Sequence, residues 1–61
     1  MDKSKMVPGE CYRVTFPDGQ PIDFKFRDTN NDSFLCEKKE GEMFFLDTVE
    51  PFDTLEKIAT W

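Results

Sequence analysis

The side chains best suited to act as nucleophiles in this sequence are two cysteines, Cys11 and Cys36, and two serines, Ser4 and Ser33. A catalytic hydroxyl or thiol needs a neighbouring base, most often histidine, and the chain contains no histidine. Thirteen carboxylates are present, but acid–base catalysis needs a cleft that raises the pKa of one of them by burial. A chain this short seldom encloses such a cleft. We therefore expect a protein that is not an enzyme, with no catalytic residue and no cofactor.

One string of residues has the spacing of metal ligands. Asp28-x-Asn30-x-Asp32 matches the first three ligand positions of a calcium loop, but Ser33 occupies the position that needs Gly, and Lys39 the position that needs Glu. Two cysteines without histidine also fall short of the four ligands of a zinc site. We interpret residues 28–32 as a polar turn and expect no metal site.

The cysteines also bear on the cellular compartment. The sequence has no apolar run near the N-terminus of the kind that would indicate a signal peptide or a membrane span. The sequence therefore favours a cytoplasmic protein without a membrane partner, in which thiols stay reduced. We expect Cys11 and Cys36 to be small, buried or half-buried thiols; the alternative, a disulfide between them, requires their strands to be neighbours.

Length and composition indicate one small domain. With 61 residues there is room for a single core, which must be densely packed to be stable. Seven Phe, one Tyr and one Trp supply that packing and argue against disorder, despite 34% charged residues. Residues 1–6 are polar and without periodicity. We predict a mobile tail over 1–6 and a single β domain over 7–61.

Alternation of apolar and polar residues predicts the first hairpin. In residues 10–16 the apolar side chains Tyr12, Val14 and Phe16 share one face, and residues 22–27 repeat the pattern. Pro17-Asp18-Gly19 between them has the composition of a tight turn. A second pair of short strands is predicted at 33–38 and 43–47, around a turn at 39–42. Phe44 and Phe45 are adjacent in the last of these, so they must point to opposite faces.

The C-terminal stretch allows two interpretations. Asp53 followed three residues later by Glu56 resembles a capping box, which predicts a short helix over residues 54–60. The alternative is a 3-10 turn at 53–56 followed by a last strand at 57–61. Both place Trp61 against the core or at its rim.

The fold class is thus mainly β: a four- to five-stranded antiparallel meander, forming either a small Src-homology-3-like barrel or a curled sheet with a short C-terminal helix or 3-10 turn.

Charge is distributed unevenly along the chain. The formal net charge is −5, residues 1–30 are balanced, and the whole excess lies in residues 31–61. This acidic half also contains the surplus aromatic rings, which favours a non-catalytic protein-binding module or self-association as a homodimer. The predicted contact residues are four rings and the acids around them: Phe44, Phe45, Phe52, Trp61, Glu42, Asp47, Glu50 and Asp53.

Two other functions remain as alternatives. A nucleic-acid-binding barrel would use Arg13, Lys25 and Arg27, which share the polar face of the first hairpin. The net negative charge disfavours nucleic acid, and we interpret the three as partners of acids on neighbouring strands. An acidic decoy that occupies a basic partner would use the six carboxylates from Glu40 to Glu56.

Overall fold

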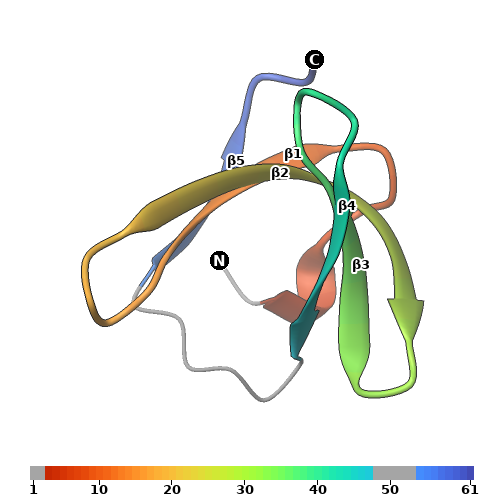
Figure 1. Ribbon diagram of the computed structural model, residues 1–61, viewed down its shortest axis with the longest axis horizontal. Helices are drawn as coiled ribbons and strands as arrows, with labels where there is room; N and C mark the ends of the chain where they lie inside the picture. Colours follow the sequence, from red (N-terminus) through yellow and green to blue (C-terminus); the bar gives the residue numbers. More distant parts are fainter. Residues whose placement is uncertain (1–2, 48–53) are drawn as a thin grey trace.

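The computed structural model describes residues 3–47 and 54–61. A short 3-10 turn, η1 (Lys3–Lys5), precedes five strands: β1 (Cys11–Thr15), β2 (Pro21–Asn30), β3 (Ser33–Glu37), β4 (Met43–Asp47) and β5 (Thr54–Ile58). All pairings are antiparallel, and the strand order is β4-β3-β2-β1-β5. Among these residues β4 and β5 are the two ends of the sheet and do not pair, so the sheet is curled rather than closed into a barrel (Figure 1).

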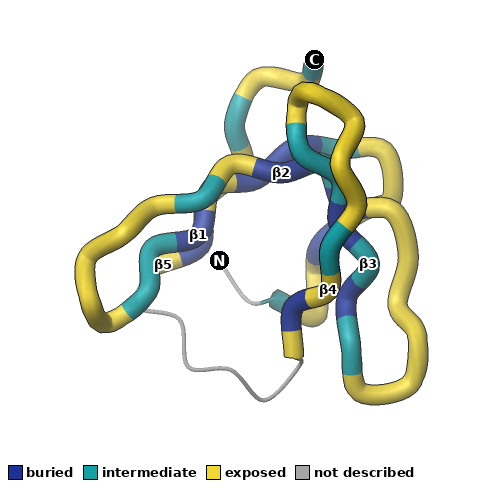
Figure 2. Tube along the Cα trace, viewed as in Figure 1, coloured by how far each residue is buried: buried dark blue, intermediate teal, exposed yellow. Residues whose placement is uncertain are grey.

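Turn chemistry fixes the two tight hairpins where the sequence predicts them. At the β1–β2 turn, Asp18 Oδ1 accepts a hydrogen bond from the Gln20 N–H at 3.0 Å, and Gly19 has a φ of 88°. At the β3–β4 turn, Gly41 has a φ of 97°. Only glycine adopts such positive φ values without a steric cost. Figure 2 shows the exposed residues at the turns and the buried ones in the middle of the strands.

Strand β2 is longer than predicted. It runs to Asn30, and the turn to β3 is confined to Asn31, whose φ is 56°, and Asp32. The prediction of a five-residue turn at 28–32 is therefore wrong for its first three residues. The register of β2 and β3 shifts between Phe26 and Asp28, a bulge that lets this polar stretch stay paired.

The C-terminal stretch is a strand and not a helix. Residues 54–58 form β5, which pairs with β1 so that Leu55 lies opposite Val14 and Ile58 opposite Cys11. The helix over 54–60 is wrong. The alternative of a last strand is confirmed, but the strand lies at 54–58 rather than 57–61, so no 3-10 turn occupies 54–56; Asp53 lies outside the described residues. Pairing with β1 satisfies backbone groups along a whole strand, which outweighs a local capping signal.

The core lies on the concave face of the sheet. It consists of Met6, Tyr12, Val14, Phe24, Phe26, Phe34, Cys36, Leu46 and Leu55, with Phe16, Ile22 and Phe44 packed against it. Edge-to-face ring pairs, such as Phe26 and Phe34 with centroids 5.7 Å apart, give it its density. Because Met6 is in this core, the packed part of the chain begins one residue before the predicted boundary.

No helix in residues 3–47 and 54–61 is long and apolar enough to cross a membrane.

Candidate binding surfaces

Three apolar side chains meet on the outer face of the sheet, which is the face turned away from the core. The register brings Leu35 of β3 opposite Phe45 of β4, with Met43 two residues earlier on the same strand. Phe45 is 59% exposed and Met43 46%, whereas Leu35 is half-buried. We call Leu35, Met43 and Phe45 the β4 patch. Large apolar groups gathered at one place on a surface are typical of contact sites.

The backbone beside this patch is open to a further strand. Among the described residues, no strand pairs with the outer edge of β4. At the closed end of the β3–β4 hairpin, the Lys38 N–H donates to the Glu42 carbonyl at 2.7 Å. Hydrogen-bonded and non-hydrogen-bonded pairs alternate along an antiparallel ladder. The N–H and C=O groups of Met43 and Phe45 are therefore directed away from β3, where an added strand could bind them.

Negative charge flanks the β4 patch. Asp28 lies opposite Leu35 on β2, and Glu42 directly precedes Met43. Both carboxylates are exposed, and neither forms an ion pair with another described residue. Glu37, opposite Met43, is already paired with Arg27 at 3.6 Å. Lys25, opposite Glu37 on β2, is half-buried and forms no ion pair with another described residue. Two unpaired carboxylates against one lysine leave the charge next to the patch negative, which complements a basic partner.

The structure separates the residues that the sequence groups into one aromatic site. Phe44 and Phe45 do point to opposite faces: Phe44 packs edge-to-face on Phe24, with centroids 6.2 Å apart, and only Phe45 is exposed. Trp61 lines a different site on the outer face. Glu42 and Asp47 are exposed. Phe52, Glu50 and Asp53 lie outside the described residues.

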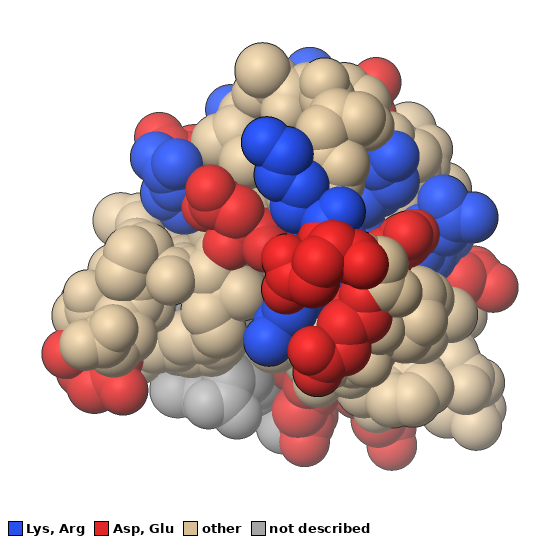
Figure 3. All heavy atoms as spheres, turned by 45° about the horizontal axis from the view of Figure 1, so that its top comes forward, with Lys and Arg blue, Asp and Glu red and all other residues tan. Residues whose placement is uncertain are grey.

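The basic residues of the first hairpin are largely paired with acids. Arg13 forms a two-pronged contact with Asp23 on β2, with nitrogen–oxygen distances of 2.7 and 3.0 Å, and Arg27 pairs with Glu37. The expected cross-strand pairing is confirmed for these two. Arg13 lowers the pKa of Asp23 through this hydrogen bond. Figure 3 shows acidic and basic atoms interspersed on the face turned toward the viewer, not an extended basic surface.

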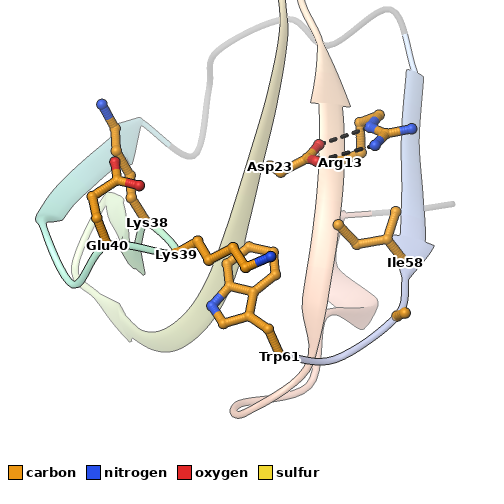
Figure 4. Close-up of a pocket in the computed structure, with 8 residues that line it drawn as sticks. Arg13, Asp23, Lys38, Lys39, Glu40, Ile58 and Trp61 are labelled. Atoms are coloured by element: carbon orange, nitrogen blue, oxygen red, sulfur yellow. Dashed lines mark hydrogen bonds and ion pairs between the residues drawn. The ribbon is translucent and has the colours of Figure 1, made fainter.

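A second site lies where the C-terminal residues meet the β3–β4 turn. It is a hollow of about 480 Å³, which we call the Trp61 hollow, lined by Arg13, Asp23, Lys38, Lys39, Glu40, Ile58, Ala59 and Trp61 (Figure 4). Two contacts hold the C-terminal stretch: Glu10 Oε2 accepts a hydrogen bond from Thr60 Oγ1 at 2.9 Å and lies 3.3 Å from Lys57 Nζ. Both contacts lower the pKa of Glu10, and the hydrogen bond from Thr60 has the larger effect. They position Trp61 beside the hollow.

The two cysteines are free thiols on opposite faces of the sheet. Cys36 belongs to the core, whereas Cys11 is next to core residue Tyr12 and therefore points to the outer face. The expectation of two buried thiols is confirmed, since both are 0% exposed. Burial raises the pKa of Cys36 to about 12, so at neutral pH this thiol is protonated and unreactive.

Sequence reasoning missed several residues of these surfaces. Met43 and Leu35 share the outward face with Phe45 by strand parity, so the alternation could have found them. Lys39 gave no such signal, because it meets Trp61 only through the tertiary fold. Within residues 3–47 and 54–61, no group of three or more histidine, cysteine or acidic side chains is placed to hold a metal ion.

Comparison of the chain with protein-family models, with curated proteins and with solved structures finds no match. The described residues form two surface features that suit a partner, the β4 patch and the Trp61 hollow. The first combines exposed apolar groups with open backbone, and the second combines an indole ring with charged side chains. Each suits a different kind of partner.

Proposed function

We propose that the chain is a non-catalytic interaction module that binds an extended, basic segment of a partner protein along the outer edge of β4. The observation that carries the proposal is the exposure of Phe45, 59%, on a strand whose outer edge pairs with no other described strand. An added strand gains affinity from backbone hydrogen bonds and specificity from its alternate side chains. Here the side chains on one face of the added strand would pack on the β4 patch, and the basic side chains on its other face would lie on the side of the sheet where strand alternation places Glu42.

Charge favours a foreign partner over a second copy. Two copies joined edge to edge at β4 would bring the acidic surroundings of one β4 patch close to those of the other, and like charges across an interface cost affinity. A lysine- or arginine-rich strand removes that cost. Homodimer formation remains the alternative outcome of the test, and it would appear as an apparent mass that rises with concentration in sedimentation equilibrium.

Two further parts of the proposal concern fold class and compartment. A meander of four strands with β5 returning beside β1 supports a Src-homology-3-like class. Two free thiols fit a reducing compartment such as the cytoplasm.

The test uses a fluorescent eight-residue peptide of alternating valine and lysine, and a control peptide of the same length and charge with proline at two central positions. Proline removes backbone donors, so it blocks strand addition while keeping the charge. We expect the first peptide to bind and to shift the amide resonances of Met43 and Phe45, and the proline peptide to bind at least tenfold more weakly.

The matched variants are Phe45→Ser in the β4 patch and Val7→Ser at a similarly exposed apolar residue outside it. Phe45→Ser should abolish peptide binding and Val7→Ser should leave it unchanged. Equal binding of the two peptides, or binding that survives Phe45→Ser, would contradict the proposal.

A further inference from the structure

The Trp61 hollow has the size of a small-molecule site. Its volume of about 480 Å³ lies within the range of known ligand pockets, roughly 300–1,000 Å³. One wall is apolar and comes from the C-terminal residues, with half-buried Ile58 and Trp61. The opposite side comes from the β3–β4 turn. These walls leave an indole ring available at the edge of a hollow that is otherwise charged.

Most charges around the hollow are already engaged or turned away. The Arg13 guanidinium donates two hydrogen bonds to Asp23. Lys38 Nζ lies 5.8 Å from the centre of the Phe44 ring, in a cation–π contact. In Figure 4 the side chains of Lys38 and Glu40 extend away from Trp61.

Lys39 is the exception. In Figure 4 its side chain reaches from the turn toward the indole, and it forms no ion pair with another described residue. The charge available beside the ring is therefore a single positive one.

A flat ring next to an ammonium group selects for an anion attached to a planar ring. Nucleobases stack on aromatic side chains whatever their identity, because every base has a π-face. Carboxylates are best recognised by the fork of an arginine, which Asp23 already occupies here, whereas lysine binds phosphate as a point charge. We propose that the Trp61 hollow binds one nucleotide unit, with the base stacked on Trp61 and the phosphate held by Lys39.

The site fits one unit rather than a long strand. The net charge of −5, together with the Asp23 and Glu56 carboxylates around Arg13, opposes a polyphosphate backbone that runs through the hollow and leaves it in both directions. The unit could be a free nucleotide or an exposed end of a single strand. This surface does not overlap the β4 patch, so its test is independent of the proposed interaction function.

Trp61 is the only tryptophan in the chain, so its fluorescence reports on this site alone. The full chain is titrated at low salt with uridine monophosphate, uridine, inorganic phosphate and a four-nucleotide oligouridylate. We expect saturable quenching by the monophosphate, at least tenfold weaker binding of uridine, and no quenching by phosphate. Equal affinity of monophosphate and oligonucleotide indicates a free nucleotide; a tenfold tighter oligonucleotide with the same dependence on Lys39 indicates a strand end.

The variant Lys39→Gln should weaken binding of the monophosphate about tenfold, because one charge-assisted contact is lost. Lys5→Gln, an exposed lysine outside the hollow, serves as the control and should change nothing. Amide resonances in residues 38–40 and 58–61 provide a second readout. Binding that is insensitive to Lys39→Gln, equal binding of uridine, or no binding at millimolar monophosphate would overturn the proposal.

Discussion

Phe44 and Phe45 are neighbours in β4 with opposite surroundings, and this predicts opposite consequences for the same substitution. Phe44 packs on the core and edge-to-face on Phe24, while Phe45 is 59% exposed on the outer face. We expect Phe44→Ala to destabilise the domain strongly and Phe45→Ala to leave its stability nearly unchanged. Because both changes are Phe→Ala in one strand, the loss of β-propensity is similar and largely cancels in the comparison.

The magnitude follows from the contacts of Phe44. Full burial of a phenylalanine side chain is worth roughly 1.5–3 kcal/mol, and Phe44 is only partly buried, so about half of that applies. The edge-to-face pair with Phe24 adds about 0.5–1.5 kcal/mol. Phe44→Ala should therefore cost about 2 kcal/mol, a large part of the roughly 3–9 kcal/mol expected for a domain of this length. Phe45→Ala should stay within about 0.5 kcal/mol.

The assay is urea denaturation followed by circular dichroism. With a denaturant dependence of about 1 kcal/mol per molar urea for so small a domain, the midpoint of Phe44→Ala should fall by about 2 M. The midpoint of Phe45→Ala should move by less than about 0.5 M. Equal losses for the two variants, or a larger loss for Phe45→Ala, would refute the assignment of the faces of β4.

Three further predictions concern thiols, pH and turn geometry. Cys36 should not react with a thiol reagent at pH 8 in the folded protein and should react fully in urea, because burial raises its pKa to about 12. In the folded chain the pKa of Glu10 lies below its ordinary value of 4.5. The stabilising contact of Glu10 with Thr60 is therefore complete above pH 4.5 and is lost as the pH falls through the lowered pKa. Trp61 fluorescence should show a transition at the lowered pKa, and in Thr60→Val this transition should move to higher pH. Gly19→Ala should cost about 1 kcal/mol in thermal unfolding, since the φ of 88° at this turn strains any side chain.

Much of the fold could be predicted because its determinants are local. Period-two alternation fixed the inward face of the first hairpin, and Tyr12 and Phe24 are in the core as that pattern predicts. The turn at Pro17-Asp18-Gly19 depends on a side-chain hydrogen bond and a positive φ that those residue types supply. The adjacency of Phe44 and Phe45 alone required one ring to point away from the core.

The rest depends on contacts between residues far apart in the chain. Residues 53–56 carry a helix-capping signal, but the open edge of β1 offers residues 54–58 a full set of backbone partners, and that long-range pairing decides their conformation. The Trp61 hollow likewise joins Arg13, Lys39 and Trp61 from three separate segments. Sequence alone therefore determined the first four strands, the two tight turns and the faces of the first hairpin. Only the tertiary structure decided which edge stays open and which side chains meet, because these outcomes depend on how distant strands pair and not on any local pattern.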